Sequence, residues 1–406
     1  MPIHLISLSI QKELPLTEPV YIFCVLLLII GIAPLIAKQL RIPSLVMLIV
    51  LGTILGSNVL GVLARNEQLV LLEKIGLLYI MFLAGLQMDL SNFKRLGLRA
   101  LIFGLLTFAI PLIVGIVSGQ LMAYSFLTAV LLGILYSPHT LVSYPIVKKL
   151  GIAQTEAVGV AVGGTIITSI LTLIGFSIVQ AFAGGSIGIL LWIKLLVLLP
   201  ALVLVYLWAV PKLGYFILEK TTDSLTTQFV FVLTCLFVAA AATSLLGVDS
   251  IVGAFIAGLA LNPLIPLTSP LMNRTEFVGN SLFIPTFLIS VGVLCNPQVL
   301  FTHPENLGIA LVVIAGAIGA KFVAAYLAGQ FFQYSFAEAM VMFSLTTPRA
   351  ALVLVIALFG KNAGLLNDGI FNTIIFFIVV TCLSGPLITD TFGRRVAGKI
   401  KSAEQT

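Results

Sequence analysis

The chain has 406 residues, of which 60% are hydrophobic and only 9% are charged, with a formal net charge of +6 and a mean hydropathy of +1.19. Soluble globular domains carry roughly 25% charged residues, so the composition excludes that class. Many apolar runs reach the roughly 20 residues that a helix needs to cross hydrocarbon, which predicts an all-α polytopic membrane protein.

Apolar windows separated by polar residues, Gly or Pro predict about thirteen transmembrane helices. The windows cover residues 19–37, 43–63, 68–88, 100–119, 122–146, 157–180, 187–209, 226–246, 251–265, 281–295, 308–330, 337–359 and 370–391.

Lysine and arginine are distributed unevenly among the predicted connections. With the N-terminus outside, fourteen of the twenty-one basic residues lie on the inner side, three lie outside and four fall within spans. Because cytoplasmic loops carry an excess of Lys and Arg, this distribution predicts an outside N-terminus and a cytoplasmic C-terminus in a cell (plasma or inner) membrane. The basic balance therefore indicates topology, and we expect no nucleic-acid partner.

Two predicted spans are interrupted near their middle. The fifth contains Ser137-Pro138-His139-Thr140 and the twelfth contains Thr346-Thr347-Pro348-Arg349. Proline breaks a helix, and the freed backbone groups are tolerated in a membrane only beside protein or a hydrated cavity. The two spans run in opposite directions, which is the inverted-repeat pattern of secondary transporters. We expect the breaks, around 137–140 and 346–349, to cross near the midplane and form the site.

Candidate site residues lie at these breaks and in two neighbouring spans. Lys321 follows thirteen apolar or small residues of the eleventh span, and an ionisable group at that depth is functional by default. A structural pairing with a carboxylate is the alternative for Lys321. Arg349 is predicted either to cap the second break or to contact substrate. His139 is a possible proton carrier near neutral pH, or a residue that satisfies backbone groups at the break.

The spans contain no mid-membrane Asp or Glu. The middle of the sixth span has only hydroxyls, among them Thr168 and Ser169. Nucleotide-binding motifs and metal-spaced clusters are absent from the sequence, so we expect no cofactor, no metal site and no enzymatic activity.

The chain from about residue 21 to 393 resembles the cation:proton antiporter superfamily, most nearly its potassium-efflux branch. The resemblance is carried by LIAKQLRIPSLVMLIVLGTILG (35–56), IGLLYIMFLAGLQMDL (75–90), SPHTLVSYPIVKKLGI (137–152), VDSIVGAFIAGLALN (248–262), FVGNSLFIPTFLISVGVLCNP (277–297) and LTTPRAALVLVIALFG (345–360). It implies a thirteen-helix homodimer in which a transport core, about 100–180 and 308–391, moves like an elevator against a dimerisation scaffold, about 19–88 and 187–295.

The sequence departs from that family at its acidic positions. Ser169 stands where the sixth span normally carries an aspartate, Gln87 where an acidic residue is common, and Asn296 where an aspartate is frequent.

The leading hypothesis is a Na⁺ or K⁺:proton antiporter in which Lys321 itself titrates. Lys321 would lose its proton when a cation enters the site. One alternative is an anion or small-solute permease, since two basic side chains without a carboxylate form an electropositive pocket. Another is a non-exchanging sensor or subunit. The predicted ion- or substrate-binding residues are Ser137, His139, Thr140, Thr168, Ser169, Lys321, Thr347 and Arg349.

Overall fold

The computed structural model describes residues 14–40, 42–87, 90–185, 197–221, 224–246, 250–296, 298, 304–349 and 351–404. Over these residues the secondary structure is helical, apart from an isolated bridge between Gly56 and Leu63. Nine of the described helices are long and apolar enough to span a membrane, and shorter apolar helices stand between them. The prediction of an all-α polytopic membrane protein is confirmed, while the count of thirteen stays a prediction.

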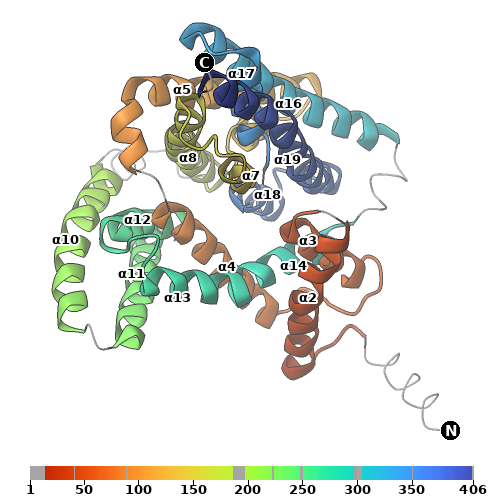
Figure 1. The fold of residues 1–406 in the computed structure, drawn as a ribbon. Coiled ribbons are helices and arrows are strands. Elements are labelled where there is room, and N and C mark those ends of the chain that lie inside the picture. The colour runs from red at the N-terminus through yellow and green to blue at the C-terminus, as the bar shows by residue number, and fades with distance from the viewer. Residues whose placement is uncertain are drawn as a thin grey trace. The chain divides into compact units, whose positions relative to one another are not determined.

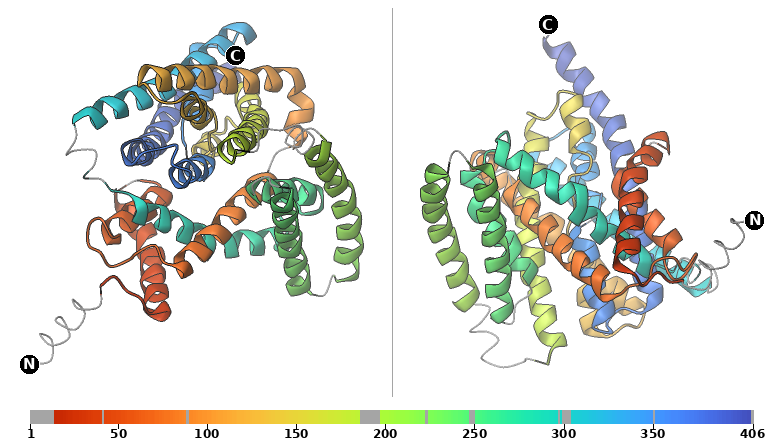
Figure 2. Two further views of the ribbon diagram at one scale, coloured as in Figure 1. Left: turned by 180° about the vertical axis from the view of Figure 1, so that it is seen from behind. Right: turned by 90° about the horizontal axis from the view of Figure 1, so that it is seen from below.

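The chain forms two compact units, each built from two separate stretches of sequence. The first unit combines residues 1–87 and 189–298. Its helices are α2 (Pro19–Leu40), α3 (Ser44–Leu55), α4 (Glu67–Leu86), α10 (Leu199–Lys220), α11 (Leu225–Leu245), α12 (Ser250–Leu261), the 3₁₀ turn η2 (Asn262–Leu264), α13 (Pro270–Val278), the π turn η3 (Gly279–Phe283) and α14 (Ile284–Leu294). Within this unit α10, α11 and α12 stand together, and α3 packs against α2 and α14 (Figures 1 and 2).

The second unit combines residues 88–188 and 299–406. Its helices are α5 (Leu90–Leu121), α6 (Phe126–Tyr136), α7 (Tyr144–Lys149), α8 (Glu156–Ala183), α16 (Pro304–Phe332), α17 (Phe336–Thr346), α18 (Ala351–Asn362) and α19 (Asp368–Glu404). Helix α5 contacts α6, α8 and α16, and α17 contacts α8, α16 and α19.

The segment of the second unit around α6 recurs around α17 at a fixed offset in the sequence. Helices α6 and α17 have 11 residues each and begin 210 positions apart, at Phe126 and Phe336. Each is capped by the serine before it, Ser125 or Ser335, whose side chain accepts a hydrogen bond from a backbone N–H in the first turn. The chain also turns through a positive φ just before each cap, 58° at Ala123 and 60° at Gln333. These are the two copies of the inverted repeat, and both end at a proline-containing break.

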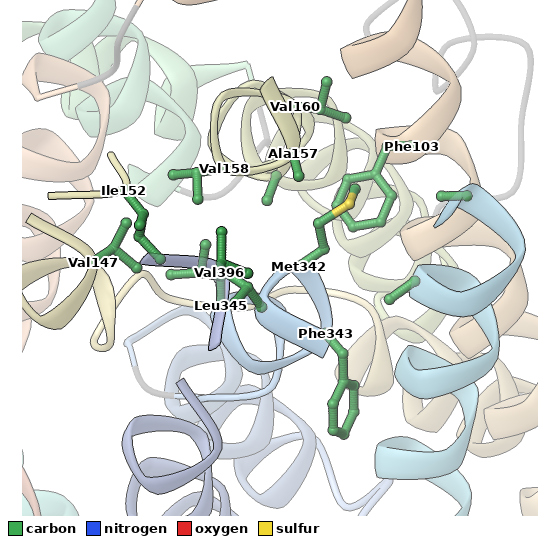
Figure 3. Packing of buried hydrophobic residues seen from close by; sticks show 14 residues of the cluster. Phe103, Val147, Ile152, Ala157, Val158, Val160, Met342, Phe343, Leu345 and Val396 are labelled. Atoms are coloured by element: carbon green, nitrogen blue, oxygen red, sulfur yellow. The ribbon is translucent and has the colours of Figure 1, made fainter. Parts of the chain in front are cut away.

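Between the repeats lies a core of buried apolar side chains. It brings together Phe103 of α5, Val158 of α8, Met342 of α17 and Val396 of α19 (Figure 3). Through this cluster, helices of the first half of the unit pack against helices of the second half. The packing connects the regions of the two helix breaks.

Four predicted window boundaries are wrong, and a fifth lies outside the described residues. Helix α3 of the second window ends at Leu55, before the predicted end at 63. Residues 187–196 of the seventh window are outside the described residues, and α10 continues to Lys220, past the predicted end at 209. Lys212 lies within α10 with its ammonium over the ring of Trp208, and Lys220, the last residue of the helix, lies over the ring of Phe216. The tenth span begins at Pro270, since exposed Arg274 interrupts the apolar pattern without ending the helix. Helix α19 runs to residue 404 because its charged end is exposed.

Candidate functional site

The two helix breaks of the second unit are joined by a main-chain hydrogen bond. Helix α6 ends at Tyr136 and helix α17 ends at Thr346. The N–H of Thr140 donates to the carbonyl oxygen of Pro348 at 2.9 Å. The predicted crossing of the breaks is confirmed, and it satisfies polar backbone groups that hydrocarbon would leave unpaired.

Arg349 binds the carbonyl ends of both interrupted helices. Its guanidinium donates to the Tyr136 oxygen at 2.8 Å, to the Thr346 oxygen at 3.0 Å and to the Thr347 oxygen. The side chain is fully buried and its Cζ lies 5.2 Å from the centre of the Phe377 ring. Because helix C-termini carry partial negative charge and unpaired carbonyls, a buried cation at this point stabilises both ends.

Lys321 of α16 is fully buried, and its ammonium has three acceptors for its three protons. Nζ donates to the carbonyl oxygen of Thr107 at 2.8 Å and to that of Ser137 at 2.5 Å. The third partner is Nδ1 of His139, at 3.2 Å. The ammonium is therefore held by the first break and by α5 through neutral groups alone.

The neighbours of His139 determine its tautomer. Nε2 lies 2.9 Å from the hydroxyl oxygen of Thr165, whose own proton is donated to the Ala161 carbonyl at 3.0 Å. Since the hydroxyl has a single proton, Nε2–H is the donor to Thr165. Nδ1 is then unprotonated and accepts from Lys321.

Hydroxyl groups lie on the same network. The Thr168 hydroxyl lies 3.1 Å from the Gly104 carbonyl oxygen, 3.0 Å from the Gly164 carbonyl oxygen and 2.8 Å from the Thr107 hydroxyl. Thr347 donates to the carbonyl four residues before it, at 2.7 Å. The side chains of Thr140 and Ser169 are half-buried, and neither has a hydrogen-bond partner within the described part of the chain.

Among the residues whose exposure the structure describes, Glu73 is the only buried carboxylate, and it lies in the first unit. It is paired there with Arg65 at 2.9 Å and accepts a hydrogen bond from Ser290. Within its described residues, the second unit thus surrounds two buried cations with carbonyls, hydroxyls and an imidazole.

The structure brings Ser137, His139, Thr168, Thr347, Lys321 and Arg349 into one hydrogen-bonded region, and Thr140 joins it through its main chain. No contact places Ser169 on Lys321 among the described residues. Sequence reasoning missed Thr107, which supplies one of the carbonyls. The available signal was Pro111, which cannot donate to the carbonyl four residues before it. Sequence reasoning also missed Thr165, the partner of His139.

The comparisons with known proteins cover most of the chain. The model of the family described as "Sodium/hydrogen exchanger, transmembrane" matches residues 25–393. The Na⁺/H⁺ antiporter NhaS5 of Synechocystis sp. is 38% identical over 392 residues, which are 94% of this chain, and the match spans 55% of that relative's length. A probable Na⁺/H⁺ antiporter 3 of Methanocaldococcus jannaschii is 29% identical over 374 residues, covering 91% of this chain and 95% of that one.

A solved structure shares the fold. The sodium proton antiporter MjNhaP1 from Methanocaldococcus jannaschii superposes with a TM-score of 0.70 at 17% identity, over 93% of this chain and 98% of the other. The family match extends over both units and both helix breaks. The chain belongs to the transmembrane sodium/hydrogen exchanger family of cation:proton antiporters.

Proposed function

We propose that this protein is a secondary active transporter that exchanges a monovalent cation, Na⁺ or K⁺, for protons by alternating access. The observation that carries the proposal is the Lys321 ammonium bound to two main-chain carbonyls, that of Ser137 at the first helix break and that of Thr107 within α5. Unwound carbonyls at such breaks are the groups that bind alkali ions in transporters, and carbonyl oxygens can replace an ion's hydration shell.

In this account the ammonium occupies the position that the transported cation takes later. A cation that reached the oxygens of Thr107 and Ser137 would meet a like charge, and two unit charges 4 Å apart repel by about 4 kcal/mol at an effective dielectric of 20. Release of the lysine proton removes that repulsion. Binding of the cation and binding of the proton therefore exclude each other, although no carboxylate takes part.

We assign nearby hydroxyls to the remaining positions of the cation's oxygen set. Thr140 and Ser169 have free hydroxyls on half-buried side chains, and Thr168 is linked to the Thr107 hydroxyl. We assign Arg349 and Thr347 to maintaining the second break, since the guanidinium binds three carbonyls there.

The geometry gives less support to an anion permease. All three protons of Lys321 have acceptors, and of the Arg349 guanidinium Nε is the nitrogen without a partner in the structure. An anion would have to displace these bonds, whereas a cation uses the same acceptors.

The wider arrangement follows from this assignment. The second unit, with the broken helices, is the moving transport core, and the first unit is the scaffold through which two copies form a homodimer in the lipid bilayer. The N-terminus faces outward and the C-terminus faces the cytoplasm of a cell membrane, as the excess of basic residues on one side favours.

Reconstituted vesicles test the proposal. A Na⁺ or K⁺ gradient should drive opposite proton movement in the natural protein, and Lys321→Gln and Lys321→Ala should abolish it. Glutamine keeps a neutral hydrogen-bond donor at this position but cannot titrate, so it separates proton chemistry from folding. Lys361→Gln is the matched control, because Lys361 forms a half-exposed ion pair with Asp368 outside the site. Full exchange in both Lys321 variants would refute the mechanism.

A further inference from the structure

The Thr107 carbonyl that holds Lys321 is free because of a proline one turn further along α5. Thr107 would normally accept the N–H of residue 111, and that residue is Pro111, inside the helix. Proline has no N–H to donate. The oxygen accepts instead from Lys321 Nζ at 2.8 Å.

A proline this deep in a membrane helix is costly unless neighbours satisfy the carbonyl it frees. Here the donor comes from another helix and carries a charge. The arrangement thus turns an ordinary helix carbonyl into an acceptor directed at the site.

The repeat places the two partners at equivalent positions. The offset that relates Phe126 to Phe336 also relates Gly119 to Gly329, and an added Cβ at either would lie 2.7 Å from the alanine at the same repeat position, Ala129 or Ala339. Helix α5 is continuous from Gly119 back past residue 111, as far as the kink at Gly97, and α16 is continuous from Gly329 back past Lys321. At this offset Pro111 of the first repeat corresponds to Lys321 of the second. One copy therefore supplies the free carbonyl and the other supplies the ammonium that fills it.

We propose that Pro111 is a positioning residue of the site. By withholding a helix N–H, it leaves the Thr107 carbonyl as a ligand that the Lys321 ammonium holds at rest and a monovalent cation takes during exchange. The binding of a cation to this carbonyl rests on the proposed antiport function. The hydrogen bond between the carbonyl and Lys321 does not.

The first experiment needs no transport. Thermal unfolding is compared for the natural protein, Pro111→Ala, Lys321→Ala and the double variant in one detergent. With Lys321 absent, Pro111→Ala gains a helix bond and loses nothing, so the unfolding temperature should rise. With Lys321 present, the new N–H competes with the ammonium for the oxygen, so the rise should be smaller or reversed. Such a difference is the coupling that a double-mutant cycle detects.

The second experiment measures equilibrium binding of Na⁺ and K⁺ in the Lys321→Gln and Lys321→Ala backgrounds, where no ammonium competes. Adding Pro111→Ala should weaken binding about tenfold, the factor expected for one lost hydrogen-bond-like contact to a charged group. Pro34→Ala in α2 is the matched control, since Pro34 also lies inside an apolar helix but belongs to the first unit.

The outcomes separate the two claims. Equal shifts of unfolding temperature in both Lys321 backgrounds would overturn the positioning role of Pro111, whatever the protein transports. Unequal shifts of unfolding temperature together with an unchanged cation affinity would overturn only the claim that the cation binds the Thr107 carbonyl. Unequal shifts with no cation binding in any variant or in the natural protein would overturn the antiport function and leave the Pro111–Lys321 relationship standing.

Discussion

The backbone N–H of Thr140 donates to the carbonyl oxygen of Pro348 at 2.9 Å, so the two helix breaks are bonded directly across the repeat. Each break leaves carbonyls and N–H groups without helical partners. Some of these groups hydrogen-bond to the other break, and some of the carbonyls accept hydrogen bonds from the buried cations. Lys321 and Arg349 therefore have a structural role even before any ion is considered.

Thr140 tests this bond through its main chain. Thr140→Pro removes the donor, whereas Thr140→Ala keeps it and removes only the hydroxyl. We expect the proline variant to lose most exchange activity and the alanine variant to retain the coupled exchange with a weaker affinity for the cation. Initial rates against cation concentration in vesicles distinguish the two, and equal activity of both variants would contradict a role for the bond.

Arg349 should determine the stability of the second unit. Arg349→Gln removes a charge that binds three carbonyls, and hydrogen bonds to charged groups contribute about 1.5–3 kcal/mol each. A loss of about 3 kcal/mol or more of unfolding free energy is expected. Arg394→Gln, which breaks an exposed pair with Asp390 one turn away, should leave the unfolding free energy nearly unchanged. Denaturant unfolding in detergent gives both values, and similar small losses would rule out the capping role.

Thr165 should act on Lys321 through His139. Thr165→Val leaves the buried Nε2–H of His139 without its acceptor, while Thr165→Ser restores it. We expect about a tenfold lower turnover for the valine variant and near-normal turnover for serine. Thr391→Val is a matched control, because Thr391 makes the same bond to its own helix but is exposed. A valine variant as active as the serine variant would show that the ring needs no such support.

The packing of α5 on α6 depends on glycine. A Cβ on Gly133 would lie 2.4 Å from the Leu112 carbonyl oxygen, whereas a Cβ on Gly319 of α16 would meet nothing within 4 Å. Gly133→Ala should therefore destabilise by about 1–3 kcal/mol through overpacking. Gly319→Ala should be neutral or stabilising, since glycine is costly within a helix. Thermal unfolding of the two variants checks this helix contact. A lower unfolding temperature for Gly319→Ala than for Gly133→Ala would contradict it.

Much of the site could be predicted because proline and buried charge are visible in a sequence. Pro138 and Pro348 mark the breaks, and Lys321 and Arg349 interrupt otherwise apolar spans. The repeat is also visible in the amino-acid sequence, since YSF occurs at 124–126 and again at 334–336. What the pattern does not contain is which carbonyl each cation reaches, because that depends on how α16 packs against α5.

Other features depend on tertiary contacts and could not be predicted. The pairing of His139 with Lys321 joins residues 182 positions apart. The early start of the tenth span arises because exposed Arg274 and the π turn η3 continue the helix across a polar stretch. The burial of Glu73 and its ion pair with Arg65 in the first unit also depend on tertiary packing.

The central claim is that a cation displaces the proton of Lys321 without help from a carboxylate. The most direct test is proton release on cation binding, followed with a pH indicator in weakly buffered detergent solution. Na⁺ or K⁺ should release close to one proton per cation bound from the natural protein, and none from Lys321→Gln, which should still bind the cation. Equal proton release by the two proteins would contradict the account.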